Sequence, residues 1–284
     1  MDYVRIVELV REVLGQYSFK PTVRQVYYRL VSPPYQVIEN KTSVYKYYDA
    51  QMVRARERAD IPRDAFSDSS RRTLGGDYGY RGPEAFKEAL IRAARPQNYT
   101  RPMWDTQPSV VEVWVEKDAL AALLNAVAEN YRVPVYASRG YSPFTLLDLA
   151  VGRFEEKGGV ILDFRDHDPS GLDMSRDVKE RLRRYGADFS YQRIALSYDQ
   201  VRAFGLAPNP TKRADPRARG YVALYGDECW ELDALPPDEL NRLVDEAIRG
   251  EIDWDSWREE EKKITEDREE LEAPLRDARE ALGE

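Results

Sequence analysis

The sequence predicts an α/β protein that consists of a small helical domain, a doubly wound parallel sheet and an acidic C-terminal helix. Three observations support this prediction. Helical periodicity and capping signals occupy the first part of the chain, and apolar strand-like runs then alternate with amphipathic segments. Acidic residues predominate at the end. We expect domains at residues 1–95 and 109–250, a linker at 96–108 and a helical tail at 251–284.

The N-terminal domain is expected to contain three helices. In residues 3–14 the apolar side chains recur with the spacing of one helix face. A second helix begins at Thr22, where T-x-x-Q matches a capping box, and residues 43–62 predict a third that ends at Pro62. The polar, glycine-containing stretch DSSRRTLGGDYGYRG follows. We therefore expect a winged-helix (helix-turn-helix) domain, with any small helical bundle as the alternative.

Strands and helices alternate after the three prolines of the linker. The apolar runs predict strands at residues 109–115, 133–138, 158–164 and 191–197. The segments between them predict helices at residues 119–130, 143–156 and 170–186. Such alternation is typical of a Rossmann-like parallel sheet. Ligands of these sheets bind beyond the carboxyl ends of the strands, so the residues that follow each strand are candidate site residues.

Acidic side chains follow two of the predicted strands. Glu116 ends the first strand, and Asp166 and Asp168 follow the third. Because side chains of an extended chain alternate with period two, both aspartates face one side. His167 points away, and we expect it to pack or to contact the metal ligands rather than to bind the metal. Three converging carboxylates repel one another unless a cation neutralises them, so we expect them to hold Mg²⁺ or Mn²⁺. The alternative is that the aspartates only cap the following helix.

Basic residues are concentrated in the body of the chain. Residues 1–220 have a net charge of +6 and residues 221–284 have −14, so a nucleic-acid surface is possible although the whole chain is acidic. We expect DNA contacts from the third helix, the wing and the loop after the second strand. The candidates are Arg54, Arg56, Arg58, Arg71, Arg72 and Arg139. The alternative for each is a solvated surface position.

The composition excludes several classes of site. One cysteine and one histidine exclude an internal disulfide and a zinc site built from Cys or His clusters. No apolar run approaches the roughly 18 residues that a membrane span requires, and no phosphate-binding G-x-x-x-x-G-K-[ST] loop is present. We expect a cytoplasmic protein.

Together the motifs resemble the Toprim domain of topoisomerases, primases and some nucleases. The matching features are VEVWVEK at the end of the first strand, the loop after the second strand, and D-x-D-P-x-G after the third. With TVRQVYYRL near the N-terminus, residues 20–235 resemble the A subunit of type IIB topoisomerases (topoisomerase VI), the shorter bacterial mini-A proteins and the related meiotic double-strand-break proteins. The chain is short for a full A subunit.

The resemblance implies Mg²⁺-dependent cleavage of double-stranded DNA by a homodimer in which the tyrosine and the metal come from different protomers. It also implies a separate ATPase subunit, GHKL-type or SMC-like, and a nucleoid-associated location in the cytoplasm. Two other functions stay open. One is a metal-dependent hydrolytic nuclease of a defence system, in which water is the nucleophile, and the other is a non-catalytic DNA-binding subunit.

The segment TVRQVYYRLV places two adjacent tyrosines in the predicted second helix. The apolar stripe of this helix includes Tyr27, whereas Tyr28 and Arg24 lie together beside it. We therefore expect Tyr27 in the core. In the resembled family the second tyrosine attacks a DNA phosphodiester and forms a 5′-phosphotyrosyl link, which implies Tyr28 as the nucleophile. Arg24 would help it to lose its proton, and Glu116 completes the expected catalytic set.

Two features near the C-terminus allow more than one interpretation. Glu231 and Asp233 are alternate acids that either support the metal site or lie on the surface. In the acidic stretch 251–284 an apolar residue recurs every seven positions, but the second apolar position of each heptad is mostly charged, and Pro274 interrupts the stretch. We therefore expect a packing or partner-docking helix rather than a long coiled coil.

Overall fold

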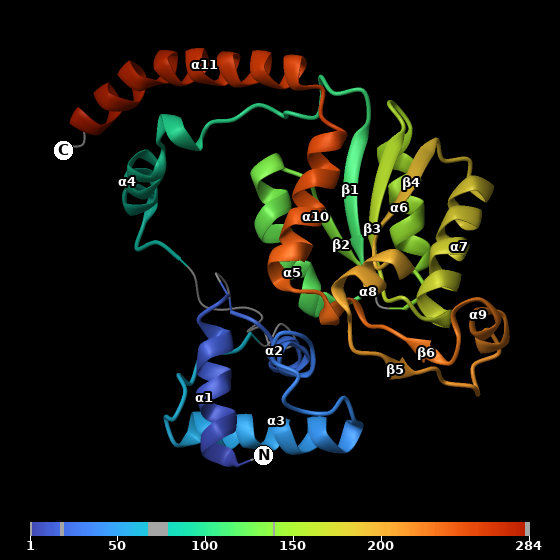
Figure 1. The fold of residues 1–284 in the computed structure, drawn as a ribbon. Coiled ribbons are helices and arrows are strands. Elements are labelled where there is room, and N and C mark those ends of the chain that lie inside the picture. The colour runs from blue at the N-terminus through green and yellow to red at the C-terminus, as the bar shows by residue number, and fades with distance from the viewer. Residues whose placement is uncertain (1, 18–19, 68–78, 139, 282–284) are drawn as a thin grey trace. The chain divides into compact units, whose positions relative to one another are not determined.

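The structure is a computed structural model, shown in Figure 1. It describes residues 2–17, 20–67, 79–138 and 140–281. Contacts divide the chain into two units. The first unit comprises Met1–Arg71 and Ser109–Glu251, and the second comprises Arg72–Pro108 and Ile252–Glu284.

The N-terminal part of the first unit contains the three expected helices. They are α1 (Tyr3–Leu14), α2 (Val23–Val31) and α3 (Thr42–Glu57). The capping box at Thr22 is formed, with Gln25 bonded back to the Thr22 backbone. α3 is shorter than the expected segment, because the chain turns at Ala59, whose backbone is left-handed (φ 59°). The expected wing falls largely on residues 68–78, outside the described residues, so the winged-helix class stays a prediction.

The expected parallel sheet is confirmed. Its strands are β1 (Val110–Val115), β2 (Val135–Ala137), β3 (Gly159–Phe164) and β4 (Phe189–Ala195), in the order β2-β1-β3-β4. All three pairings are parallel, and Val115 lies opposite Phe164. The residues that follow β1 and β3 therefore emerge at the same edge of the sheet.

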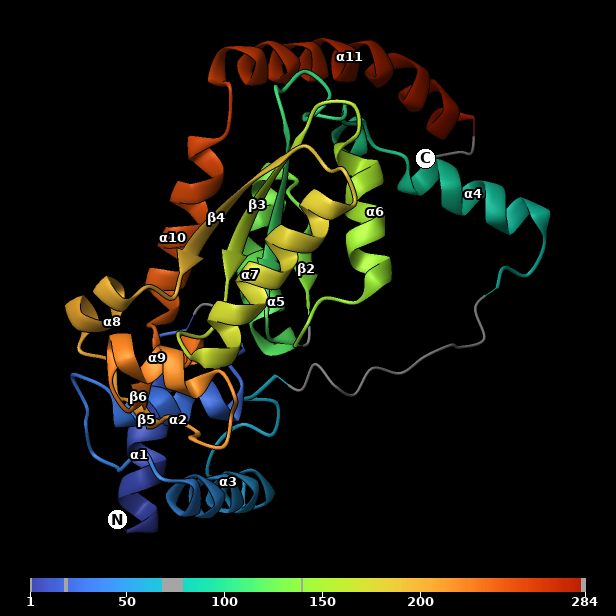
Figure 2. The ribbon, with the colours of Figure 1, turned by 90° about the vertical axis from the view of Figure 1, so that its right-hand side faces the viewer.

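Helices cover both faces of this sheet. α6 (Phe144–Phe154) and α7 (Pro169–Arg184) lie on one face, and α5 (Asp118–Ala128) and α10 (Pro237–Gly250) lie together on the other (Figures 1 and 2). This two-sided arrangement explains why the strands are apolar on both faces.

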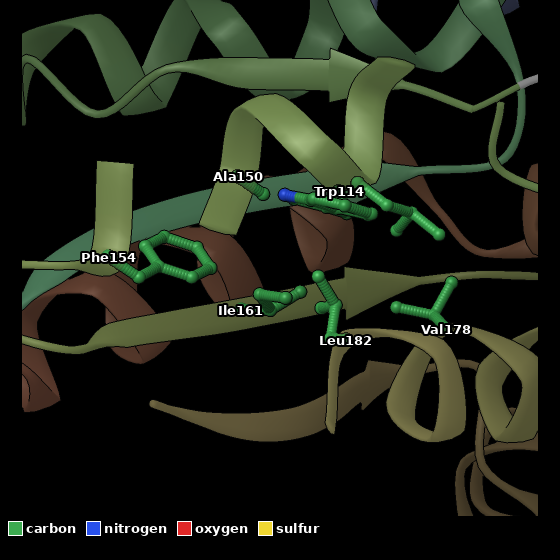
Figure 3. Packing of buried hydrophobic residues seen from close by; sticks show 7 residues of the cluster. Trp114, Ala150, Phe154, Ile161, Val178 and Leu182 are labelled. Carbon is green, nitrogen blue, oxygen red and sulfur yellow. The ribbon is translucent and has the colours of Figure 1, made fainter. Parts of the chain in front are cut away.

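One apolar cluster joins the first of these faces to its helices. Trp114 of β1 and Ile161 of β3 pack against Phe154 of α6 and Leu182 of α7, and all four side chains are fully buried (Figure 3). Gly159 begins β3 beneath Phe154, where an added Cβ would lie 2.4 Å from the ring. Burial of such side chains stabilises by about 1.5–3 kcal/mol each. The cluster thus holds β1 and β3 in the register that aligns their carboxyl ends.

The chain after β4 returns to the carboxyl edge of the sheet. It forms α8 (Tyr198–Phe204), β5 (Asn209–Pro210), α9 (Ala218–Tyr225), β6 (Glu228–Cys229) and the short helix η3 (Leu232–Ala234). β5 and β6 pair antiparallel, and a β-bridge joins Trp230 to His167. Residues near 209 and 231 are thereby brought to the loop that follows β3.

The described part of the second unit contains α4 (Pro83–Ala93), the short 3-10 helix η1 (Pro96–Asn98) and α11 (Trp254–Glu280). The predicted helical tail is therefore confirmed, and α11 continues through Pro274. Segment 72–95, which we expected in the N-terminal domain, groups with this tail. Arg101 binds Asp267 (2.7 Å), and Tyr99 donates to the same carboxylate. None of the described helices has the length and apolar character to cross a membrane.

Candidate functional site

A cleft of about 890 Å³ lies at the carboxyl edge of the sheet, within the first unit. Its walls come from α2, the start of α3, the residues after β1 and β3, and the β5–β6 pair. It brings together five of the predicted site residues: Arg24, Tyr28, Glu116, Asp166 and Asp168. Further polar residues line it: Lys41, Lys117, Asn209, Lys212, Arg217 and Glu231.

Glu116 directly follows β1, where its backbone N–H donates to Phe164 O (3.1 Å). Its Oε2 atom is buried and has no hydrogen-bond partner among the described residues. Burial, and next the nearby Asp166 carboxylate, raise the pKa of Glu116 to about 7, although Lys117 opposes this. The site therefore contains a carboxylate whose ionisation is opposed by burial and by a neighbouring acid.

Asp166 is nearly fully buried in the loop after β3. Its Oδ1 atom accepts hydrogen bonds from Leu232 N (2.8 Å) and pairs with Lys117 Nζ (2.9 Å). Burial raises the pKa of Asp166 to about 6 despite the lowering effect of Lys117. Asp233 and Glu231 act in the same direction as burial.

Lys117 is the internal cation of this acidic group. Its ammonium contacts Asp166, Asp233 (2.9 Å) and Glu231 (3.0 Å). Burial disfavours the charged form, but Asp233, Asp166 and Glu231 outweigh burial and raise the pKa of Lys117 well above its usual value. Glu231 and Asp233, whose role the sequence left open, therefore bind a lysine that lies between them and Asp166.

Asp168 caps α7, as the alternative interpretation of the sequence proposed. Its Oδ1 atom accepts from Gly171 N (2.6 Å) at the helix start. Asp168 also lines the cleft and raises the pKa of Glu116. Asp168 therefore caps the helix and also belongs to the acidic side chains of the cleft.

Two arginines, the half-buried Arg193 and the buried Arg165, hold the loop that carries the aspartates. Arg193 donates to Asp166 O (2.6 Å) and to Gly171 O (3.1 Å). Arg165, which is fully buried, binds Asp163 (2.7 Å) and donates to Ser138 Oγ (3.0 Å) after β2. These bonds fix the backbone that aims Asp166 and Asp168 at the cleft.

His167 packs in the interior, as predicted. Its backbone exchanges two hydrogen bonds with Trp230 (2.9 and 3.0 Å), and its Nδ1 atom lies 2.8 Å from Tyr221 Oη. The rings of Tyr198 and Tyr225 also surround it. Burial, helped by the positive charge of Arg193, lowers the pKa of His167 to about 4. This residue anchors the loop to the segment that carries Glu231.

The carboxylates are chemically suited to a divalent cation. Mg²⁺ and Mn²⁺ prefer hard oxygen ligands, and the unpartnered Glu116 Oε2 atom supplies one beside Asp166 and Asp168. Among the described residues, however, no three acidic, histidine or cysteine side chains surround one common position. The donor atoms thus suit such an ion chemically. In the present arrangement, Lys117 neutralises part of the charge of the acidic side chains.

Tyr28 lies in the cleft, but the prediction that it stands clear of the core was wrong. Both tyrosines are buried, with exposed fractions of 2% for Tyr27 and 3% for Tyr28. The apolar stripe predicted burial of Tyr27 alone, because it indicates only one packed face of α2. Residues near 209 and 231 cover another face of this helix. Tyr27 is held by Oη contacts to the carbonyl oxygens of Glu39 (2.9 Å) and Lys41 (3.3 Å).

The hydroxyl of Tyr28 accepts two long hydrogen bonds. The donors are Arg24 Nη2 and Asn209 Nδ2, each at 3.5 Å. Burial and then the Glu231 carboxylate raise the pKa of Tyr28 to about 12, while Asn209 and Arg24 lower it. In this arrangement Tyr28 is therefore protonated at neutral pH.

Arg24 is paired more closely with an acid than with the tyrosine. Its Nη2 atom lies 2.6 and 2.7 Å from the two carboxylate oxygens of Glu231. Burial is the largest single effect and lowers the pKa of Arg24, but Glu231, the Tyr28 hydroxyl and Asp233 together outweigh it, so the net effect is a raised pKa. Arg24, the cation expected to assist Tyr28, thus lies one turn before it on α2, but its guanidinium is paired with Glu231.

The three predicted DNA-binding arginines that the structure describes do not line this cleft. Arg54 and Arg58 lie over the ring of Tyr3 (4.9 and 5.5 Å), and Arg56 lies over Phe66 (5.6 Å). Only the first turn of α3 reaches the cleft, and residue 58 is about 20 Å further along the helix axis. Arg71, Arg72 and Arg139 lie outside the described residues.

Sequence reasoning missed several polar residues of the cleft. Lys117 had a signal, because it directly follows Glu116 at the end of a strand. Asn209, Lys212 and Arg217 belong to no motif, and they reach the cleft only because β5 and the segment after it return to the sheet edge.

No protein-family model, curated protein or solved structure matches this chain. The fold and the cleft therefore define its class by themselves: an α/β protein with a four-stranded parallel sheet and an acidic, cation-bordered cleft at the carboxyl edge.

Proposed function

We propose that this chain cleaves DNA by metal-assisted transesterification, as a protein similar to the A subunit of type IIB topoisomerases. The observation that carries the proposal is the single cleft lined by Tyr28 and by Glu116, Asp166 and Asp168. A tyrosine nucleophile and a set of carboxylates are the two parts that this chemistry requires. They come from distant segments of the chain, which supports a shared role.

The carboxylates have the role of metal ligands in this proposal. Glu116, Asp166 and Asp168 would hold Mg²⁺ or Mn²⁺, and the unpartnered Oε2 atom of Glu116 and the raised pKa of this residue support the assignment. When bound, such an ion stabilises negative charge on the phosphate and on the leaving oxygen. Lys117 keeps the acidic group together in the absence of the ion.

Tyr28 supplies the attacking oxygen. Its Oη atom bonds to phosphorus, the bond from phosphorus to the 3′ oxygen breaks, and the released strand takes up a proton as a 3′ hydroxyl. The phenol proton has to leave before or during attack, and the Arg24 guanidinium, 3.5 Å from Oη, favours the phenolate. Lys41, Lys212 and Arg217 border the cleft and suit the phosphates of double-stranded DNA.

The proposed assembly is a homodimer that acts with a separate ATPase subunit of the GHKL or SMC-like kind. This part of the proposal rests on the motif resemblance alone. The same holds for a nucleoid-associated location.

Replacement of Tyr28 by phenylalanine tests the proposed nucleophile. Tyr28→Phe keeps the buried ring and removes Oη, whose two hydrogen bonds are long, so the free energy of unfolding should change by less than about 1 kcal/mol. Cleavage of supercoiled DNA with Mg²⁺ should be lost. Wild-type protein trapped with denaturant should carry DNA covalently attached through a 5′ phosphate.

Tyr27→Phe is the matched control. It removes a hydroxyl that donates to Glu39 O (2.9 Å), so it should cost about 1 kcal/mol of stability and leave cleavage intact. Cutting by Tyr28→Phe without any adduct would contradict the tyrosine mechanism.

Such a result would favour a second candidate function, hydrolysis of DNA by a metal-dependent nuclease. One observation supports it. The pKa of Tyr28 is raised to about 12, whereas the pKa of Glu116 is raised to about 7, the range in which a general base activates water most effectively. If neither form cuts DNA under any metal or partner condition, a non-catalytic DNA-binding subunit is the remaining alternative.

A further inference from the structure

Glu231 connects the tyrosine side of the cleft to the acidic side. Its carboxylate lies 2.6 and 2.7 Å from Arg24 Nη2 and 3.0 Å from Lys117 Nζ. Arg24 lies on α2 beside Tyr28, and Lys117 lies next to Glu116 after β1. One carboxylate therefore pairs with two cations that come from different segments of the chain.

The charge of Glu231 is maintained by these two contacts. Burial opposes its ionisation, but Lys117 and Arg24 outweigh burial and lower the pKa of Glu231. The carboxylate thus stays negative at neutral pH although it lies among other acids. It has the charge and the oxygen pair that a phosphodiester group would present to the same cations.

The two cations depend on Glu231 to different degrees. Lys117 keeps Asp166 and Asp233 as partners if Glu231 leaves. The side chain of Arg24 is 48% exposed and that of Glu231 is 21% exposed, so this pair lies on the accessible side of the cleft. Its separation would release Arg24 without leaving Lys117 among the acids uncompensated.

We propose that Glu231 is an internal competitor of phosphate: it occupies an anion site formed by Arg24 and Lys117, and a phosphodiester enters by displacing it. Once displaced, Glu231 no longer competes for Arg24 with the hydroxyl of Tyr28, which lies 3.5 Å from the guanidinium. The identity of the anion as DNA rests on the proposed function, whereas the anion site itself rests on the geometry of the three side chains.

Glu231→Gln tests the competition, because glutamine keeps the shape of the side chain and removes its charge. Glu228→Gln is the matched control: it removes the same charge three residues earlier, from an exposed position on β6 outside the cleft. All variants carry Tyr28→Phe and are measured without divalent metal, so that binding is separated from cleavage. The two probes are a short DNA duplex and inorganic phosphate.

Glu231→Gln should bind the duplex about tenfold more tightly than the parent, and Glu228→Gln should gain about twofold or less. The logarithmic salt dependence should steepen by about 0.9 for Glu231→Gln, because one more phosphate contact is made. Inorganic phosphate should follow the same order of affinity. Adding Arg24→Gln to Glu231→Gln should cancel the gain, since the site then lacks its accessible cation.

Two outcomes separate this inference from the proposed function. If the parent protein does not bind DNA but Glu231→Gln gains affinity for inorganic phosphate over Glu228→Gln, the anion site stands and the DNA-cleaving function falls. If Glu231→Gln gains no more than Glu228→Gln with either probe, the inference is overturned, whatever cleavage shows. Should Glu231→Gln melt at a lower temperature, Glu231→Asp, which keeps the charge on a shorter side chain and so competes less well for both cations, has to give a smaller gain of the same sign.

Discussion

Glu116 and Asp166 are carboxylates whose ionisation the fold opposes. Their pKa values are raised to about 7 and about 6, mainly by burial. Between about pH 4 and about pH 7 the folded protein therefore binds more protons at these groups than the unfolded chain does, so the free energy of unfolding decreases as pH rises through this window. A divalent cation acts in the opposite direction, because it favours the ionised forms.

Glu116→Gln should remove a large part of this pH dependence. The pKa of Glu116 is raised from its usual 4.5 to about 7, so the wild-type protein should lose roughly 2–3 kcal/mol more stability than the variant between about pH 5 and about pH 8. Urea denaturation at the two pH values measures the difference. At the higher pH, Mg²⁺ should stabilise the wild type and have little effect on Glu116→Gln.

Equal pH slopes in the two proteins would show that Glu116 is not held against ionisation. Stabilisation of Glu116→Gln and wild type to the same degree by Mg²⁺ would remove Glu116 from the proposed ligands.

At the scale of elements, the start of α7 determines where the aspartate loop lies. Gly171 is the third residue of this helix, and a Cβ atom there would lie 2.2 Å from the backbone oxygen of Asp166. The same glycine donates to Asp168 Oδ1 through its N–H. The close approach of loop and helix therefore requires glycine, which the sequence motif D-x-D-P-x-G contains at this position.

Gly171→Ala should displace Asp166 and cost about 1–3 kcal/mol of stability, the range for added atoms in a packed interior. The proposed response to Mg²⁺ should be lost with it. Gly152→Ala is the control, because Gly152 lies inside α6 with nothing within 4 Å of its added Cβ, and it should stabilise by about 0.5–1 kcal/mol. Thermal melts with and without Mg²⁺ measure both effects. A Gly171→Ala protein as stable and as Mg²⁺-responsive as the wild type would refute the steric argument.

α3 presents a second testable surface. Arg54 and Arg58 are exposed near the end of α3, on the side of Tyr3, and Arg56 is half-buried beside Phe66. Each arginine that reaches a DNA phosphate contributes about 0.9 to the slope of log affinity against log salt concentration. Replacing all three by glutamine should therefore flatten the slope by up to about 2.7. Binding isotherms over a series of salt concentrations measure it, and an unchanged slope would exclude the last turn of α3 from the interface.

At the scale of the whole molecule, the two halves of the proposed chemistry lie in one chain. Tyr28 comes from the N-terminal helices and the carboxylates come from the sheet, and both line the cleft within the first unit. The motif resemblance implied instead that tyrosine and metal come from different protomers. The structure places the proposed tyrosine and carboxylates in one cleft of one chain, which makes the two arrangements distinguishable.

Mixing two inactive variants tests the arrangement. If each chain assembles its own site, a mixture of Tyr28→Phe and Asp166→Asn should not cleave DNA, because every cleft lacks one part. We expect this result from the shared cleft. Wild-type protein diluted to the same degree with either variant controls for subunit exchange. Recovery of single-strand nicks in the mixture would show instead that the site is completed by a partner subunit.

Much of the fold was predictable from local sequence. The strands β1, β3 and β4 and the helices between them lie within about two residues of their predicted ends, because burial patterns and capping depend on neighbours along the chain. The alternation of strands and helices also determined that Glu116, Asp166 and Asp168 reach one edge. His167 was correctly assigned to packing, because side chains of an extended chain alternate between two sides.

Only the tertiary structure decided how the charges at that edge neutralise one another. Lys117 meets Asp233 across 116 positions of the sequence and Arg24 meets Glu231 across 207, and no periodicity records such a contact. The burial of Tyr28 was missed likewise, because the apolar stripe of α2 describes one packing partner and the residues near 209 and 231 supply another. Local sequence determines which elements form and which side chains they carry. Electrostatic pairing depends on distances between segments, and the fold alone sets those distances.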